Sequence, residues 1–401
     1  GLCLNVVHSE MTTFSGVAPI IIYDAKKRKT VTYRGIGWWP KAITPDYFLR
    51  LHGGDMPYDM TQCVVPAAVD AWLQVLQNHG TMSFEQVVES ALWYADNGFP
   101  AHEFMIETLR GYKKPYMWPE TAAIFLPNDG EPPNVGQTIV NKDLAETFRR
   151  LIRAERSAAS KGRQVGLQAV RDYFYRGPVA EAMVELSKGR GGLLEMEDFA
   201  DYESDAWPPV KVEFGRYTVL GCGPWSQGPV APLALNILKN FNLEAMGHNS
   251  AEYLHTVICA LELAFSDRHH YMGDPSFTAV PIEGMLSEEY GRDRAKLIQP
   301  GTAFTEMPRP GNPWDYQSAN VAWPDTPVER LTRYENVGVP GQDPDVGDRW
   351  DNDTSYVACA DSSGNFFSAT PSDGTGGPCP LVPDFGMSIS TRGVQSYTEV
   401  N

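Results

Sequence analysis

Residues 351–370 read Asp351-Asn-Asp-Thr354-Ser-Tyr-Val-Ala-Cys-Ala-Asp361-Ser-Ser-Gly364-Asn-Phe-Phe-Ser-Ala-Thr370. Two runs in this stretch, 355–360 and 365–370, are rich in aromatic, β-branched and small residues, and the polar residues between them are typical of a turn. The pattern predicts a β-hairpin. The preceding residues, 338–353, contain glycine, proline and five aspartates, which indicates a solvated loop. Thr354 therefore lies where an exposed loop enters a strand.

This position would make Thr354 reactive if it became an N-terminal residue. If the chain were cut on its N-terminal side, Thr354 would carry both a nucleophilic hydroxyl and a free α-amine. A threonine hydroxyl needs a base to remove its proton, and an N-terminal amine can be that base. Such an amine titrates near pKa ~8, so part of it is neutral at physiological pH. Threonine at a strand start is also simply a good β former, so the residues alone leave both interpretations open.

A family resemblance favours the first interpretation. Asp353-Thr354-Ser355-Tyr356, followed by 360–365, resembles the processing site of γ-glutamyltransferase-type N-terminal-nucleophile hydrolases. The resemblance covers nearly the whole chain, because further motifs occur in the family's order. These are Pro19–Asp24, Thr44-Pro45-Asp46, Val65-Pro66 with Trp72, Tyr94–Pro100, Phe174–Gly177, Gly192-Leu193 with Glu197-Asp198, Gly247–Ser250, Ser266-Asp267-Arg268 and Gly273-Asp274-Pro275.

The resemblance implies an α/β fold, with an αββα sandwich core and helical elaborations of a large subunit. Residues 1–353 would form the large-subunit region, and 354–401 the start of the small subunit that carries the nucleophile. Only 47 residues, 355–401, follow Thr354, and they cannot supply two stacked sheets. We therefore expect more protein beyond Asn401. The abrupt apolar start at Gly1 leads us to expect a missing N-terminal segment as well.

The resemblance also implies roles for individual residues. Thr354 matches the family nucleophile, and self-cleavage would occur between Asp353 and Thr354. Ser372 matches a hydroxyl residue that hydrogen-bonds the nucleophile. The glycine pair of the family's oxyanion hole would lie beyond Asn401.

The substrate-binding positions depart from the family pattern. Ile36 stands where the family has a carboxylate-binding arginine, although Arg34 lies two residues away and could substitute for it. Asp373 or Gly374 replaces an asparagine, and the acidic segment that grips the glutamyl amine is replaced by 388–393, which includes Arg392. We predict substrate-binding roles for Arg392, Arg34, Trp38 and Trp39, with core packing of the two tryptophans as the alternative.

These observations predict a self-processing threonine amidohydrolase, formed as a zymogen, that hydrolyses the C–N bond of an amide or transfers its acyl group. Its substrate would be a small non-γ-glutamyl amide with a carboxylate or aromatic group. Oxamate-type amidohydrolases and acylases are the nearest activities that the resemblance implies. The alternatives are a γ-glutamyl hydrolase or transferase and a catalytically degenerate binding homologue. The expected assembly is a heterodimer of processed subunits, with a higher oligomer left open, and no cofactor is expected.

Composition excludes other classes of function. A net charge of −17 argues against nucleic-acid binding, and no run of about 18 apolar residues predicts a membrane span. The six cysteines form no CxxC pair, which favours buried thiols and a reducing, cytoplasmic compartment. The uncertain N-terminus leaves a periplasmic or secreted protein open.

Three further motifs are candidate ligand sites. We expect no metal at His269-His270 with Asp274, because adjacent helical histidines point in different directions, nor in the Asp-rich run 343–353, which lacks the pattern of a calcium loop. The segment Gly221–Gly228 has the wrong spacing for a dinucleotide loop. The family resemblance places its second half, Pro224–Gly228, near the active site instead.

Hydrophobic periodicity predicts the remaining elements. Strands are expected over 17–23 and 30–34, and helices over 66–80, from Ser83 to Asn97 with a Ser83–Gln86 capping box, and over 142–156. A hairpin over 209–220 should turn at Gly215. A long helix should be capped by Asn249 and Glu252 and bury Leu254, Val257, Ile258, Leu261 and Phe265. Residues 300–350 should be irregular.

Overall fold

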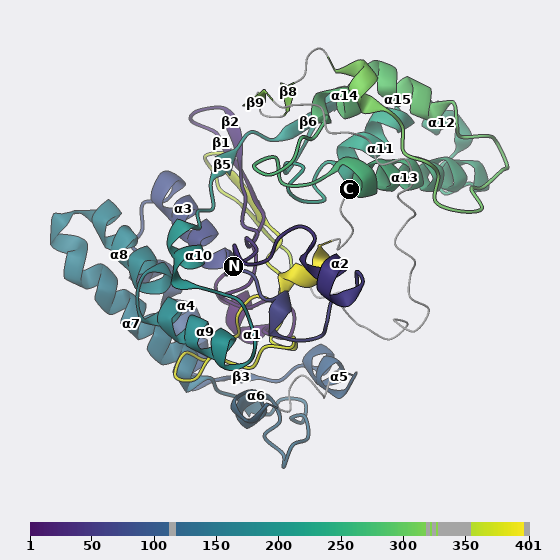
Figure 1. The fold of residues 1–401 in the computed structure, drawn as a ribbon. Coiled ribbons are helices and arrows are strands. Elements are labelled where there is room, and N and C mark those ends of the chain that lie inside the picture. Colours follow the sequence, from purple (N-terminus) through teal and green to yellow (C-terminus); the bar gives the residue numbers. More distant parts are fainter. Residues whose placement is uncertain (112–117, 318–320, 323–325, 328–353, 397–401) are drawn as a thin grey trace.

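The computed structural model describes residues 1–111, 118–317, 321–322, 326–327 and 354–396. Its centre is a five-stranded antiparallel sheet in the order β10-β11-β1-β2-β5 (Figure 1). The strands are β1 (Ile20–Asp24), β2 (Lys29–Tyr33), β5 (Ala206–Trp207), β10 (Val357–Ala360) and β11 (Phe366–Ala369). The predicted hairpin over 355–370 and the predicted strands 17–23 and 30–34 are therefore confirmed, with somewhat shorter strands. They are also joined, because β11 pairs with β1 in the register Ile20↔Ala369.

The turn of the C-terminal hairpin is built by one side chain. The carboxylate of Asp361 accepts hydrogen bonds from the backbone N–H groups of Ser363 and Asn365, each at 2.9 Å. Gly364 has a φ of +84°, a conformation that glycine adopts without steric cost. The side chain of Asn365 accepts from the backbone N–H of Ala25 at 2.9 Å, so the turns of the two hairpins are held against each other.

Helix α3 (Ala68–His79) packs on this sheet. Its small residues Ala68 and Ala71 lie against Ile20 and Tyr33 in one buried cluster. The small side chains allow a close approach, and Asp70 at the start of the helix favourably faces the positive end of the helix dipole. The prediction of a helix over 66–80 is confirmed within two residues at its start and one at its end.

Helices and short strands from before and after α3 form a further layer, which encloses the largest apolar core of the described residues. The predicted capping box at α4 is confirmed, since the Ser83 and Gln86 side chains each accept from the other residue's backbone N–H. The predicted stripe on α7 is confirmed too: Leu144, Phe148, Leu151 and Ile152 are buried. The elements of this layer are α1 (Leu4–Val7), α2 (Tyr47–His52), η1 (Met60–Gln62), α4 (Phe84–Asn97), β3 (Phe99–Pro100), α5 (Glu103–Gly111), α6 (Pro119–Phe125), β4 (Thr138–Ile139), α7 (Lys142–Ala158), η3 (Ala159–Lys161), α8 (Arg163–Tyr175), α9 (Pro178–Gly189) and α10 (Met196–Asp201).

A second lobe is built from residues 210–317 (Figure 1). The predicted hairpin around Gly215 is confirmed, and it packs on the helices with its own apolar clusters. The elements are β6 (Val210–Phe214), β7 (Tyr217–Gly221), α11 (Val230–Leu238), α12 (Leu243–Met246), α13 (Ala251–Tyr271), α14 (Ile282–Leu286), α15 (Glu288–Ala295) and η4 (Pro313–Tyr316), with the short pair β8 (Val321–Ala322) and β9 (Thr326–Pro327) beyond. Most of the predicted irregular segment 300–350 lies outside the described residues.

The prediction for α13 was wrong in two respects. Its N-cap is Ser250, whose hydroxyl accepts from the Tyr253 backbone N–H at 3.1 Å, whereas Asn249 precedes the cap. The predicted buried stripe is partly on the surface, since Ile258 is 55% exposed and Leu254 44%. The buried face carries the smaller Cys259, Ala260 and Ala264, because small side chains allow α11 to pack closely.

Candidate active site

The hydroxyls of Thr354 and Ser372 meet at one end of the central sheet. Their Oγ atoms lie 3.0 Å apart, at hydrogen-bond distance. Strand-like pairing produces this contact, because Thr354 and Ser372 form an antiparallel bridge and Ser372 exchanges backbone hydrogen bonds with Val17. The residues that the sequence analysis chose as nucleophile and hydroxyl partner are thus brought together. Asp353 lies outside the described residues.

Arg392 extends this contact into a chain of three side chains. Its guanidinium Nη2 donates to Ser372 Oγ at 2.5 Å, and its side chain is largely buried. Gly393, the next residue, is required by space, since a Cβ there would lie 2.3 Å from the Trp39 ring and 2.4 Å from the Gln62 carbonyl oxygen. The close packing around Gly393 holds Arg392 in place.

Asp373 also holds the loop that carries Arg392, through hydrogen bonds to Thr391. Its carboxylate accepts from the Thr391 backbone N–H at 3.1 Å and from the Thr391 hydroxyl at 3.2 Å. Its φ of +84° is rare for a residue other than glycine. The sequence analysis noted Asp373 only as a departure from the family's asparagine. Its role in holding the loop before Arg392 depends on a contact across 18 residues that no local signal reveals.

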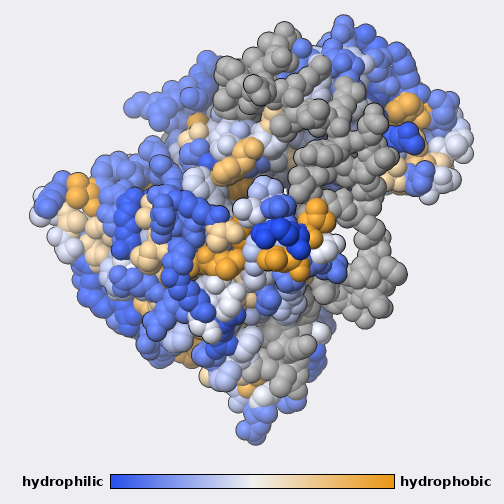
Figure 2. Space-filling view, in the orientation of Figure 1, coloured by the Kyte–Doolittle hydropathy of each residue, from blue (hydrophilic) through white to orange (hydrophobic). Residues whose placement is uncertain are grey.

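Thr354, Ser372 and Arg392 line a cleft of about 1120 Å³. Trp38 and Trp39 line it too, together with the loop 224–228, as expected from the resemblance. Figure 2 shows apolar residues gathered at the centre of this face, between the two lobes. The aromatic lining consists of Trp38, Trp39, Phe48, Trp225, Tyr271, Phe277 and Trp314. Both lobes contribute aromatic rings, so the cleft suits a flat apolar group beside the two hydroxyls.

The two predicted tryptophans also pack against neighbours. Trp38 makes edge contacts with Tyr202 and Phe277, with ring centroids 5.4 and 6.0 Å apart. Trp39 packs on Phe48, and its indole N–H donates to Ser396 Oγ at 3.2 Å. Both rings are half-buried. They therefore pack against their neighbours in the cleft wall and still expose surface to the cleft.

Arg34 does not line the cleft with them. Its buried guanidinium forms ion pairs with Asp205 at 2.9 Å and with Asp274 at 2.6 Å, and it also donates to Ser276 Oγ at 2.7 Å. Trp38 and Trp207 flank it, with ring centroids 5.4 and 5.3 Å from the guanidinium carbon. Arg34 therefore ties the central sheet to the second lobe. Its neighbour Ile36 does line the cleft.

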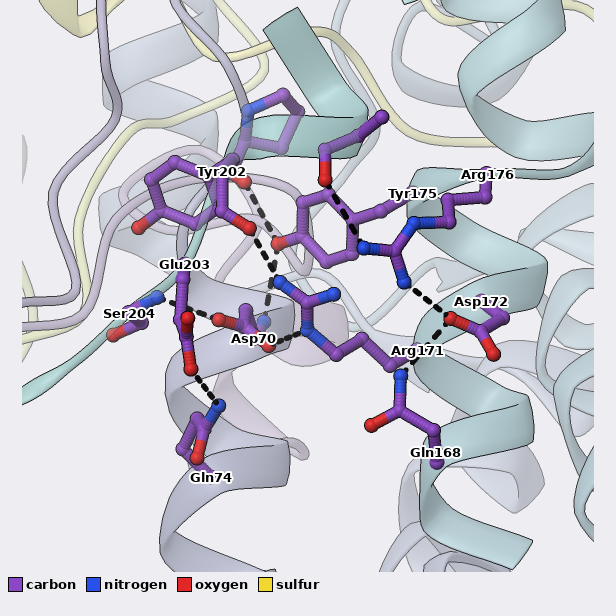
Figure 3. A network of polar contacts seen from close by, with 12 residues as sticks. Asp70, Gln74, Gln168, Arg171, Asp172, Tyr175, Arg176, Tyr202, Glu203 and Ser204 are labelled. Atoms are coloured by element: carbon purple, nitrogen blue, oxygen red, sulfur yellow. Dashed lines mark hydrogen bonds and ion pairs between the residues drawn. The ribbon is translucent and has the colours of Figure 1, made fainter. Parts of the chain in front are cut away.

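A buried polar network around Asp70 and Arg171 (Figure 3) holds the segment that carries Ile36 and Trp38. Asp70 on α3 accepts from Arg171 Nε and from the Ser204 backbone N–H, both at 2.6 Å. The Ser204 hydroxyl donates to the Arg34 carbonyl, and the Tyr202 hydroxyl to the Ile36 carbonyl, each at 2.9 Å. The network thus connects α3 and α8 to the cleft wall.

Charge within the cleft is mixed. Arg268 and His270 line it alongside Asp198, Asp201 and Asp274. Burial raises the pKa of the Cys222 thiol to about 12, so this cleft-lining thiol is protonated at neutral pH and does not compete as a nucleophile. No three cleft-lining His, Cys, Asp or Glu side chains among the described residues place their ligand atoms within metal-binding distance of one another. Nor does any described helix have the length and apolar character needed to cross a membrane.

Comparisons with known proteins find relatives over most of the chain. The chain matches the family profile described as Gamma-glutamyltranspeptidase over residues 1–399. It is 30% identical over 97% of its length to the glutathione hydrolase proenzyme of Bacillus subtilis (strain 168), and it spans 62% of that protein. It is 26% identical over 80% of its length to the acylase ACY 1 proenzyme of Pseudomonas sp. (strain SE83), covering 49% of it.

Solved structures show the same fold. The γ-glutamyltranspeptidase of Helicobacter pylori aligns with a TM-score of 0.68 at 25% identity, over 76% of this chain and 84% of that one. The cephalosporin acylase of Bacillus halodurans aligns with a TM-score of 0.78 at 24% identity, over 100% of this chain and 65% of that one. The predicted N-terminal-nucleophile hydrolase fold is confirmed. With a profile match across almost its entire length, the chain belongs to the γ-glutamyltranspeptidase family.

Proposed function

We propose that the protein is a self-processing amidohydrolase with Thr354 as its nucleophile, acting on an amide with a bulky aromatic group and not on γ-glutamyl compounds. The observation that carries the proposal is the 3.0 Å contact between Thr354 Oγ1 and Ser372 Oγ at the wall of an aromatic cleft. Similarity to proteins named as hydrolase and acylase proenzymes supports the reaction class and the expectation of processed subunits.

Maturation would begin with attack of Thr354 Oγ1 on the carbonyl carbon of the preceding residue, Asp353. The peptide C–N bond breaks as an ester bond forms, and the hydroxyl proton ends on the released α-amine of Thr354. Water then hydrolyses the ester, which leaves a carboxylate on Asp353 and the free hydroxyl on Thr354. The new amine is the base that activates the hydroxyl in catalysis.

In catalysis, Thr354 Oγ1 would attack the substrate's amide carbonyl while the α-amine accepts its proton. That proton passes to the leaving amine as the C–N bond breaks, and water then hydrolyses the resulting ester. Ser372 acts on the nucleophile in both steps. Because Arg392 occupies a lone pair of Ser372 Oγ, the Ser372 hydroxyl can donate its own proton towards Thr354 Oγ1. A donor at this position stabilises developing negative charge on the nucleophile.

The cleft argues for the substrate class. A γ-glutamyl head carries a carboxylate and an amine, and a site without the matching charges rejects such a group strongly. Ile36 stands where an arginine would bind the carboxylate. The nearby Arg34 does not line the cleft, and its charge is neutralised by Asp205 and Asp274. The aromatic rings instead offer a large apolar surface. A carboxylate on the substrate would have Arg268, which lines the cleft, as its partner.

The first test is the mass and N-terminal sequence of the full-length protein after purification. We expect two fragments, the smaller beginning at Thr354, and a single uncleaved chain for Thr354→Ala. Thr354→Ser keeps a hydroxyl and should still be cleaved. Cleavage at another bond would contradict Thr354 as the processing residue, and an uncleaved wild-type chain would favour a binding homologue.

The second part of this test compares substrates on the cleaved protein. Anilides with aromatic acyl groups and a γ-glutamyl anilide share a leaving group, so the difference in kcat/KM reports on the acyl pocket alone. We expect the aromatic amides to be preferred by at least about 100-fold, the factor expected when polar partners are missing. Equal turnover of the γ-glutamyl anilide would contradict the substrate assignment.

A further inference from the structure

Two histidines converge on a buried glutamate behind the active site. His8 and Glu10 follow α1, and His102 immediately precedes α5. Glu10 Oε1 lies 2.7 Å from His8 Nδ1 and 3.2 Å from His102 Nε2. One ligand atom from each of the three residues lies within 4.8 Å of the other two.

Glu10 lacks the partners that a buried carboxylate needs. Its side chain has no exposed surface, and Oε2 has no hydrogen-bond partner within the described part of the chain. Across the same residues, its ion pairs are with the two histidines and with no lysine or arginine. An unpaired buried carboxylate oxygen is costly, so the second oxygen points to a missing positive ligand.

The histidines make the site reachable and keep it ordered. Their side chains are 25% and 39% exposed, so an ion could enter from solvent. Phe104 packs against both imidazoles, with ring centroids 5.8 Å from His8 and 6.5 Å from His102. The aromatic contact restrains both imidazoles beside Glu10.

We propose that His8, Glu10 and His102 bind one divalent transition metal ion of the Zn²⁺ type. Two imidazole nitrogens and a carboxylate are ligands that Zn²⁺ prefers, with water completing the coordination. No metal site is predicted from the sequence, and residues as far apart as Glu10 and His102 form no local motif that would reveal this cluster. The site is distinct from the cleft and does not depend on the proposed amidohydrolase activity.

The hydrogen bonds of the metal-free state show what binding must change. His102 Nδ1 accepts from the Met105 backbone N–H at 3.1 Å, so neutral His102 carries its proton on Nε2, the nitrogen that lies 3.2 Å from Glu10 Oε1. A metal at Nε2 moves that proton to Nδ1 and breaks the contact with Met105. His8 Nδ1 donates to Glu10 Oε1 at 2.7 Å, so a metal at Nδ1 moves that proton to Nε2 and replaces this hydrogen bond. Metal binding thus exchanges the hydrogen bonds of His102 with Met105 and of His8 with Glu10 for bonds to three ligands.

The location indicates a structural ion. The Ser9 backbone carbonyl accepts from the Thr375 backbone N–H at 2.9 Å. Thr12 forms a parallel β-bridge with Asp373. These contacts attach the 8–12 segment to the loop that follows Ser372. An ion shared by this segment and α5 would stabilise the support behind the active site.

The test is binding of Zn²⁺ to untagged, chelator-treated full-length protein, followed by calorimetry, with Co²⁺ absorption as a second probe of coordination. We expect one equivalent to bind and to raise the Tm. Glu10→Gln removes the charged ligand. His102→Asn removes a ligand yet keeps a side-chain oxygen that can accept from Met105. Each should weaken binding by at least about 100-fold, whereas His248→Asn, at an exposed histidine outside the cluster, should bind like wild type.

Circular dichroism of the metal-free variants shows whether each is folded. If Glu10→Gln does not fold, the affinity of His102→Asn for Zn²⁺ tests the proposal on its own. Absence of stoichiometric binding to the wild-type protein would overturn the proposal. Equal affinity of His102→Asn and wild type would overturn it as well, by showing that the ion binds elsewhere.

Discussion

Arg392 is the residue whose role changes most between the sequence and the folded chain. The sequence analysis proposed it as an anchor for a substrate carboxylate. Its 2.5 Å contact with Ser372 Oγ supports a positioning role instead, in which Arg392 orients the Ser372 hydroxyl towards Thr354. The two roles differ in what they change, because an anchor acts on substrate binding and a positioning residue acts on the nucleophile in every chemical step.

Arg392→Met should therefore lower kcat and leave KM nearly unchanged. Losing a buried charge-assisted hydrogen bond costs about 2–4 kcal/mol, or roughly 30- to 1000-fold in rate. Steady-state kinetics on the preferred amide measure both constants. Arg392→Lys retains the charge without the planar fork and should recover part of the rate. A higher KM at unchanged kcat would restore the substrate-anchor interpretation.

At the scale of elements, the Asp70–Arg171 ion pair joins α3 to α8. Asp70 also accepts from Ser204, whose hydroxyl holds the Arg34–Trp38 segment. Both side chains are almost entirely buried. A buried ion pair contributes little net stability compared with an apolar pair of the same size. Removal of one partner, however, leaves the other charge buried without a counterion, which is strongly destabilising. The pair therefore specifies how these helices are oriented towards the Arg34–Trp38 segment.

Asp70→Asn should lower the free energy of unfolding by about 3–5 kcal/mol, because Arg171 is then buried without a counterion. The double variant Asp70→Leu with Arg171→Met removes both charges and should be less destabilised than Asp70→Asn. Urea unfolding of the three proteins measures the difference. A loss of under about 1 kcal/mol for Asp70→Asn, the value of a surface pair, would contradict the role of the network.

For the whole molecule, Arg34 is the tie between the two lobes that form the cleft. It reaches from the end of β2 to Asp205 beside β5 and to Asp274 after α13. Since each lobe supplies aromatic side chains to the cleft, the shape of the cleft depends on this junction.

Arg34→Met should destabilise the protein by about 2–5 kcal/mol, since it leaves Asp205 and Asp274 without their cation. The ratio of kcat/KM for a carboxylate-bearing amide to that for its neutral analogue should stay at the wild-type value, because Arg34 does not line the cleft. Unfolding curves and a matched substrate pair test the two statements. A selective loss of the carboxylate-bearing substrate would instead identify Arg34 as its anchor.

The sequence by itself predicted the hairpins, the helices α3, α4 and α7, the family, and Thr354 and Ser372 as candidates for one site. These are local patterns: alternation, helical periodicity, turn residues and motifs in a known order, each readable within a few residues. Tertiary structure alone decided which face of α13 is buried, because burial depends on how closely α11 can approach its small residues. It also decided that Arg34 ties lobes, that Arg392 contacts Ser372, and that His8, Glu10 and His102 meet. Long side chains reach several partners, and only the packed fold selects among them.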